Sequence, residues 1–426
     1  MGESQRTVDS SVTGLAARLF GGRHNLAVIG AVIVSTFFIG FGGGVVFPIL
    51  PNLGQLLGIS PLVVGLILSA NRFSRLVANA PAGALVDRIG TRTPFIAGMF
   101  IQSIGTVGYV VALAMPLPEV WFLLARVLWG VGSALVFATA FTIAADVSGG
   151  DSRGANMGLI RGGLIFGFPT GIVLGGLVSE IWGNAAAFGV AAVFAGVATV
   201  VAHTLVPETH IEDEARRSIR PWEIHTGTPA LTVGLVNFAV LFVYIGALFA
   251  TLVLFLPAND LGVFGLGPQA SSGIFMAVTV LSAGGFMFLS GYVTDRRQSR
   301  VPTLVFFLVI TFVGFLLLAA ASSVATLTLA CIFIGAGQGG TSGPLLALLA
   351  DLTPAEEMGR AVGTNNVFGD IGGGIGPIVS LPLVDVVGFW PVYLVCALIP
   401  LGAVAVLLAG VYRSTGEFVP RVGTPG

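Results

Sequence analysis

The sequence predicts an all-α membrane protein with twelve transmembrane helices in two pseudo-symmetric six-helix bundles. Of its 426 residues, 55% are hydrophobic and only 9% are charged, whereas soluble globular proteins carry about 25% charged residues. A spanning helix needs about 20 mostly apolar residues, and no charged side chain occurs between His24 and Arg72 or between Arg300 and Asp351. Landmarks in the first half also recur in order in the second half, which predicts the two-bundle arrangement.

The expected spans are apolar stretches separated by proline, asparagine and serine turn signals. They cover residues 26–50, 61–85, 93–115, 118–146, 156–180, 184–206, 229–256, 268–293, 301–320, 323–350, 360–383 and 387–412. This divides the chain into an N-terminal segment, a first bundle, a linker, a second bundle and a tail, at residues 1–25, 26–206, 207–228, 229–412 and 413–426. The linker carries eight charged residues, so we expect a surface connector that partly forms an amphipathic interfacial helix.

The basic residues predict the orientation in the membrane. All 19 are arginine, and with a cytoplasmic N-terminus fifteen of them fall on the cytoplasmic side, four inside spans and none in an outer loop. Because cytoplasmic loops carry an excess of positive charge, we expect a multi-pass protein of the prokaryotic plasma membrane with both termini cytoplasmic. The lack of lysine also excludes a P-loop ATPase motor and a pyridoxal Schiff base.

The two halves repeat with a nearly constant offset. The stretch Gly83-Ala-Leu-Val-Asp87-Arg88 matches Gly291-Tyr-Val-Thr-Asp295-Arg296, 208 residues later. Three further landmarks recur at similar offsets: Gly130, Gly132 and Asp146 match Gly335, Gly337 and Asp351 at 205 residues, Pro51 matches Pro257 at 206, and Arg153 matches Arg360 at 207. Parallel repeats of this kind place a central cavity between the halves near the membrane midplane. We therefore expect a substrate cavity at the interface of the two bundles.

Two motifs resemble those of the major facilitator superfamily. The loop from Gly83 through Asp87, Arg88 and Gly90 to Arg92 is similar to that family's signature loop, and Arg126-Val-Leu-Trp-Gly-Val-Gly is similar to its second motif. The resemblance extends over residues 26–412 through the span number, the repeat and the linker. It implies the major facilitator fold and a transporter that uses an ion or solute gradient.

Within that family, the chain resembles the drug:proton antiporter group. Those proteins carry a stretch rich in glycine and proline in the fifth span, which here reads Gly167-Phe168-Pro169. The phenylalanine between the glycine and the proline departs from the group's pattern. The resemblance to multidrug-resistance exporters is therefore weaker than the resemblance to transporters in general.

The signature loop also implies a cytoplasmic gate, because in the family an Asp-Arg pair at this helix end locks the halves together. An arginine can pair with an acid at the end of a neighbouring span, such as Asp146, and an acid gains from the dipole at a helix N-terminus. The alternative is a solvated turn that only follows the positive-inside rule. The expected gate residues are Gly83, Asp87, Arg88, Gly90, Arg92, Asp146, Gly291, Asp295 and Arg296.

Two charged residues inside spans are candidates for proton coupling. Asp370 is the only acid near the middle of an expected span. Charge at the bilayer centre costs about 2.5–3.5 kcal/mol on insertion scales, so we expect Asp370 to face the cavity and to bind the coupling proton or a cationic substrate. The family uses an arginine at the position of Arg126 in proton exchange or substrate binding. The alternatives are a polar contact of Asp370 with its glycine-rich surroundings and an Arg126 that only bonds backbone carbonyls.

The remaining polar residues inside spans are basic. Arg72 and Arg75 share one helix face, with Asn71 beside them, and Arg161 lies in the fifth span. Arginine binds carboxylate and phosphate in a bidentate manner, so a cavity lined by these residues together with Arg126 and Asp370 would favour anions. The alternative is that some of them reach the interface or pair with carbonyls.

We therefore predict a secondary active transporter that exports a small drug-like or metabolic compound against protons by alternating access. One alternative is a transporter of organic anions or sugar-like solutes that uses the buried arginines. An alternative of another class is a membrane sensor or scaffold that moves nothing. An enzyme is not expected, because the sequence shows no nucleophile–base cluster; nor are a cofactor or a metal site. The expected partners are a small-molecule substrate, protons and the lipid bilayer, with no nucleic acid, and we expect a monomer.

Overall fold

The computed structural model describes residues 23–147, 153–209, 226–296 and 299–421. The side chains of several helical residues within these ranges, Arg161 and Asp295 among them, lie outside the description. The described ranges contain helices and connecting turns and no β-strand. The helices are α2 (Arg23–Val45), α3 (Leu50–Leu57), α4 (Pro61–Ile89), α5 (Arg92–Ala114), α6 (Pro118–Val147), α7 (Arg153–Trp182), α8 (Asn184–Leu205), α9 (Thr228–Leu241), η1 (Phe242–Phe249), α10 (Ala250–Ala258), α11 (Pro268–Arg296), α12 (Val301–Ala319), α13 (Val324–Leu352), α14 (Met358–Val387) and α15 (Phe389–Thr415).

The helices have the length and hydropathy of membrane spans. Eleven segments of the described chain are long and apolar enough to cross a membrane, with mean hydropathies from 1.3 to 2.7. The helix α7 contains a shorter apolar part at Phe166–Trp182. Since a span needs about 20 apolar residues, the chain is a multi-pass membrane protein. This confirms the all-α membrane class predicted from the sequence.

The first expected span differs from the structure at its end. The helix α2 ends at Val45, a turn covers residues 46–49, and α3 then continues to Leu57. Pro48 lies in the turn, where its missing N–H cannot continue a helical hydrogen-bond ladder. Pro51 lies in the first turn of α3, where proline is well tolerated. The chain therefore makes a short packed helix where the sequence predicts a connection.

The expected span at 229–256 contains a π-helical segment, η1, between α9 and α10. At this point the backbones of η1 and α14 approach closely, because a Cβ on Gly246 would lie only 2.4 Å from Cα of Gly376. The Ser380 hydroxyl donates a hydrogen bond of 2.8 Å to the Gly246 carbonyl oxygen. π-Helical turns occur mostly as local bulges within α-helices, and here the bulge lies where α14 crosses.

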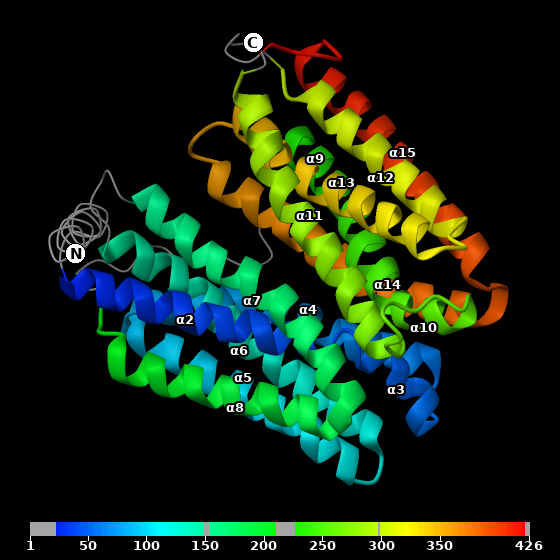
Figure 1. Cartoon of the computed structure of the whole chain (residues 1–426). Coiled ribbons are helices and arrows are strands. Elements are labelled where there is room, and N and C mark those ends of the chain that lie inside the picture. Colours follow the sequence, from blue (N-terminus) through cyan, green and yellow to red (C-terminus); the bar gives the residue numbers. More distant parts are fainter. Residues whose placement is uncertain (1–22, 148–152, 210–225, 297–298, 422–426) are drawn as a thin grey trace, which may run out of the picture.

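The helices form two groups, α2–α8 and α9–α15 (Figure 1). The groups meet at the end of the molecule that contains α3 and α10, and they separate toward the end where both chain termini lie (Figure 1). We call the end with the termini the terminal side and the opposite end the far side. The backbones of the two groups therefore lie together on the far side and apart on the terminal side (Figure 1).

Small residues allow the two groups to approach on the far side. A Cβ on Gly65 of α4 would lie 2.7 Å from the carbonyl oxygen of Pro377 in α14. A Cβ on Gly176 of α7 would lie 2.5 Å from the carbonyl oxygen of Gln269 in α11. Close backbone approach through small residues is the usual way in which helices pack in membranes. The contact between the groups is thus made by α4 with α14 and by α7 with α11.

Candidate functional site

The contact between α4 and α14 contains a cluster of three charged side chains, Arg72, Arg75 and Asp370. Arg72 Nη1 lies 3.2 Å from Asp370 Oδ1. Arg75 donates through both Nε and Nη2 to the same carboxylate, with an Nε–Oδ2 distance of 3.3 Å. The exposed side-chain fractions are 14% for Arg72, 22% for Arg75 and 8% for Asp370. One carboxylate therefore joins the two helix groups by bonding two arginines of the opposite group.

Helical periodicity on α4 and small residues on α14 produce this geometry. Arg72 and Arg75 lie three residues apart and so occupy one face of α4. Asp370 lies in a segment of α14 that is rich in glycine, and the Arg72 guanidinium packs directly over Gly373, where a Cβ would lie 3.0 Å from Arg72 Cζ. The neighbouring Ser69 hydroxyl donates to the carbonyl oxygen of Gly374. A bulkier residue at 373 would push the guanidinium out of its present position.

The cluster carries more positive than negative charge. Two guanidinium groups share one carboxylate, so the three groups together carry a charge of +1 when Asp370 is ionised. Arg75 also lies over the ring of Phe137, with Cζ 5.7 Å from the ring centroid, a distance at which a cation is attracted to an aromatic face. The Asp370 carboxylate can therefore accept a proton, or the two arginines can donate hydrogen bonds to an anion.

Arg126 is buried next to this cluster but is bonded within the first helix group. It is 1% exposed and donates to the carbonyl oxygens of Ile67 at 3.2 Å and Leu68 at 2.8 Å. It also donates to Asn71 Oδ1 at 2.6 Å. Arg126 thus bonds three acceptors of α4, all of them in the residues just before Arg72. The structure brings together the predicted residues 71, 72, 75, 126 and 370, whereas the side chain of the predicted Arg161 lies outside the described part.

Three phenylalanines pack where the groups meet, in a contact that is not predicted from the sequence. Phe47 follows α2, Phe168 lies in α7 and Phe249 is the last residue of η1. The ring centroid of Phe249 lies 5.6 Å from that of Phe47 and 6.4 Å from that of Phe168. The rings of Phe168 and Phe249 are nearly parallel, at 7°. Phe168 is the residue that separates the glycine and the proline of the fifth-span motif. Its departure from that pattern supplies an aromatic contact between the two groups.

On the terminal side, the expected gate loop between α4 and α5 is bound by the segment that follows α8. The Glu208 carboxylate accepts hydrogen bonds from the backbone N–H of Thr91 at 2.7 Å and of Arg92 at 3.2 Å. Acids are favourable at a helix N-terminus because they satisfy free N–H groups there. Arg92 in turn donates to the carbonyl oxygens of Val206 at 2.9 Å and His203 at 3.1 Å. Glu208 is not among the residues predicted from the sequence, although it is the first acid after the sixth expected span.

The other expected gate residues lie at helix ends of the terminal side. Arg88 is exposed and Asp87 is half-buried, and Asp146 accepts a hydrogen bond of 3.3 Å from the Thr209 hydroxyl. In the second group, Arg296 lies over the ring of Tyr292 with Cζ 4.2 Å from the centroid, and the Asp295 side chain is outside the described part. Gly83 and Gly291 both lie in open surroundings. The structure therefore places these residues on the side where the two groups are apart.

Comparison with known proteins agrees with the fold. A multi-drug resistance efflux pump, PmrA of Streptococcus pneumoniae, is 26% identical over 369 residues, which are 84% of this chain and 89% of that protein. An uncharacterized MFS-type transporter of Schizosaccharomyces pombe is 32% identical over 169 residues, but the match spans only 38% of this chain and 37% of that protein. The crystal structure of a bacterial homolog to the human lysosomal transporter Spinster, in an inward-facing and occupied conformation, superposes with a TM-score of 0.76 at 15% identity, over 95% of this chain and 100% of that one.

The family comparison covers nearly the whole described chain. The model described as Major Facilitator Superfamily matches residues 32–377 and 300–422. These ranges include both helix groups and the charged cluster between α4 and α14. The chain belongs to the Major Facilitator Superfamily of membrane transporters.

Proposed function

We propose that the protein is a proton-coupled secondary transporter that exports a small drug-like or metabolic compound by alternating access. The arrangement that fits this function is twelve spans in two six-helix bundles, 26–206 and 229–412, joined by a cytoplasmic linker. Both termini then lie in the cytoplasm, and the terminal side is the cytoplasmic side. The arginine distribution supports this orientation. The pneumococcal relative is a multi-drug resistance efflux pump, which supports the direction of transport.

The observation that carries the proposal is the ion-pair cluster between α4 and α14. Alternating access requires the two groups to separate on the far side and to approach on the terminal side. Such a movement must break the contacts of Asp370 with Arg72 and Arg75, because these residues belong to opposite groups. Two unit charges 4 Å apart attract by about 4 kcal/mol at an effective dielectric constant of 20. The cluster is therefore a contact that a single proton can weaken.

Protonation of Asp370 supplies that release. A neutral carboxyl group keeps at most hydrogen bonds to the arginines and loses the charge attraction, so the far side can open. When Asp370 loses its proton, the pairing re-forms and favours the closed far side seen in Figure 1. Arg126 supports the site by fixing the backbone of α4 through Ile67 and Leu68. Substrate and proton can then act on the same equilibrium between the two states.

On the terminal side, we assign the cytoplasmic gate to the loops after α4 and α11. The gate consists of Gly83, Asp87, Arg88, Gly90, Arg92, Asp146, Gly291, Asp295 and Arg296. While the two groups are apart on the terminal side, the gate residues of one group are separated from those of the other. When that side closes, the charged gate residues of the two groups can form ion pairs with each other. The contact of Glu208 with Thr91 and Arg92 keeps the first loop in place meanwhile.

A second substrate class, organic anions or sugar-like solutes, has a specific observation in its favour. The described cluster holds two arginines for one carboxylate, and Arg126 adds a third buried cation beside Asn71. An anionic substrate would replace Asp370 as the acceptor of Arg72 and Arg75, and arginine suits such bidentate binding. In this case the substrate itself, rather than a proton, breaks the contact between the groups.

Transport by purified protein in liposomes with an imposed pH gradient tests the proposal. We expect substrate movement to drive proton movement in the wild type and expect Asp370→Asn to lose this coupling. The matched control is Asp385→Asn, which removes an exposed acid of the same helix. Flux of organic anions, whether or not it responds to the pH gradient, would support the second substrate class. Unchanged proton coupling in Asp370→Asn would refute the role of Asp370, and a lack of any flux across a broad substrate panel would favour a sensor or scaffold.

A further inference from the structure

A small cavity inside the first helix group contains a buried amide without a protein partner. The amide belongs to Gln102 of α5, which is 2% exposed. Neither its Nε2 nor its Oε1 has a hydrogen-bond partner among the described residues. Because buried polar side chains in proteins are nearly always hydrogen-bonded, this amide indicates a ligand that supplies the missing bonds.

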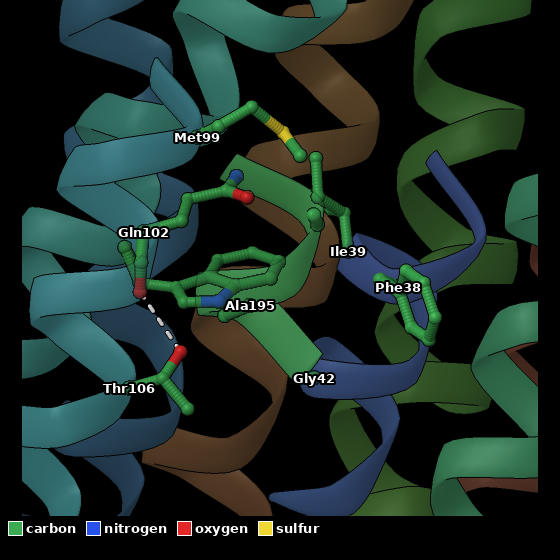
Figure 2. A pocket seen from close by; sticks show the side chains of 9 residues that line it. Phe38, Ile39, Gly42, Met99, Gln102, Thr106 and Ala195 are labelled. Carbon is green, nitrogen blue, oxygen red and sulfur yellow. Dashed lines mark hydrogen bonds between the residues drawn. The ribbon is translucent and has the colours of Figure 1, made fainter. Parts of the chain in front are cut away.

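The walls of the cavity are mostly apolar. They are formed by α2, α5, α6 and α8, and include Phe38, Gly42, Met99, Trp129 and Ala195. In Figure 2 the Gln102 side chain extends from α5 toward Ile39 of α2 and lies beside Met99. The small residues Gly42 and Ala195 leave the space that the amide reaches into. In the structure no wall residue accepts a hydrogen bond from the amide N–H or donates one to the amide oxygen.

The cavity has the size and polarity that one water molecule requires. Its free volume for water centres is about 10 Å³, which corresponds to about one water molecule. A buried water needs two to four polar partners. The Gln102 amide offers a donor and an acceptor, and the Thr106 hydroxyl also lines the cavity. That hydroxyl already donates to the Gln102 carbonyl oxygen at 2.8 Å, so its lone pairs remain to accept a hydrogen bond.

We propose that Gln102 and Thr106 form a binding site for a single internal water molecule between α2, α5, α6 and α8. The Gln102 N–H and the Thr106 lone pair bind the water from two directions, and the water donates to Gln102 Oε1. Trp129, which lines the cavity, is three residues from Arg126 and so lies on the same face of α6. The water thus supplies hydrogen bonds to a buried amide for which the described helices of this group provide none.

X-ray radiolytic footprinting of the purified full-length protein tests this proposal. Radicals formed from a bound water oxidise side chains next to it even when bulk solvent does not reach them. Met99 lines the cavity and is 2% exposed, whereas Met276 is a fully buried methionine of the second group. We expect Met99 to be oxidised about tenfold faster than Met276 in the wild type. We expect this excess to disappear in Gln102→Leu, which removes both hydrogen-bonding atoms.

Thermal unfolding gives a second, independent outcome. If the cavity is dry and the amide only packs against the indole of Trp129, replacing Gln102 by Leu removes an unpaired polar group and raises the melting temperature. If the water is bound, the same change removes satisfied hydrogen bonds and leaves the melting temperature equal or lower. Equal oxidation of Met99 and Met276 in the wild type would overturn the proposal, and so would a melting temperature raised by Gln102→Leu. The wild-type comparison stands even if the variant fails to fold.

Discussion

Replacing Asp370 by asparagine tests how strongly the charged cluster holds the two helix groups together. The change removes the negative charge but keeps the shape of the side chain. Arg72 and Arg75 then lie side by side on α4, at its contact with α14, without a negative charge between them. We expect both the stability of the protein and the closure of its far side to decrease.

The size of the effect follows from burial. Removing one partner of a buried ion pair costs about 3–5 kcal/mol, because an uncompensated charge stays buried. The side chains of Arg72 and Arg75 are 14% and 22% exposed, so water screens part of their charge. We therefore take the lower end, about 3 kcal/mol for Asp370→Asn. For Arg75→Gln we expect about 2 kcal/mol, because Arg72 still compensates the carboxylate.

A double-mutant cycle measures the interaction itself. The free energy of unfolding, or the melting temperature in one detergent, is compared for wild type, Asp370→Asn, Arg75→Gln and the double variant. Groups in direct contact couple by about 0.5–3 kcal/mol, so the double variant should lose less than the sum of the single losses. The control is Asp385→Asn. Strict additivity of the two single losses, or a gain of stability in Asp370→Asn, would refute the reasoning.

Three further changes test the surroundings of the site. Gly373→Val places a side chain where the Arg72 guanidinium packs, 3.0 Å from Cζ, and should reduce transport more than tenfold while the protein still folds. Phe249→Ala removes a fully buried ring between the groups and should cost about 3 kcal/mol of stability, seen as a lower melting temperature. Glu208→Ala removes the acceptor of two N–H groups at the start of α5 and should cost about 1 kcal/mol.

Each of these changes has a matched control. Gly363→Val alters a glycine of α14 that has no neighbour within 4 Å, and it should leave transport unchanged. Phe264→Ala removes a ring that is 89% exposed, and Glu417→Ala removes an exposed acid; both should leave the melting temperature within about 1 °C of the wild type. A control that loses as much as its partner would show that the loss is unspecific.

The sequence predicts the membrane class because hydropathy reports the solvent of each segment directly. It does not predict η1, since the π-helical turn depends on the approach of Gly376 to Gly246, two residues 130 positions apart. The same limit applies to α3. Its Leu50 and Leu53 are buried by helices that follow later in the chain. The local helix signals, Pro51 in the first turn and Gly58 after the last, also occur in turns and so do not settle the assignment.

In the candidate site too, features that depend on local spacing can be predicted from the sequence, whereas contacts between distant parts of the chain cannot. The shared face of Arg72 and Arg75 follows from their spacing and can be read from the sequence. Their pairing with Asp370, 298 and 295 residues away, cannot. The sequence does mark Phe168 as unusual, because a phenylalanine interrupts the fifth-span pattern. It does not show that Phe168 contacts Phe249 in the other helix group. Unusual residues within a family pattern are therefore useful candidates for contacts between the groups.

The imbalance of charge in the cluster connects the two substrate classes. With Asp370 ionised the three groups carry +1, and with Asp370 protonated they carry +2. Protonation therefore weakens the contact between the groups and, in the same step, makes the two arginines a stronger site for an anion. A cationic or neutral substrate gains nothing from the second effect. Measuring substrate affinity at two pH values thus separates the classes: an anion should bind more tightly to the protonated protein, and Asp370→Asn should hold that tighter affinity at both pH values.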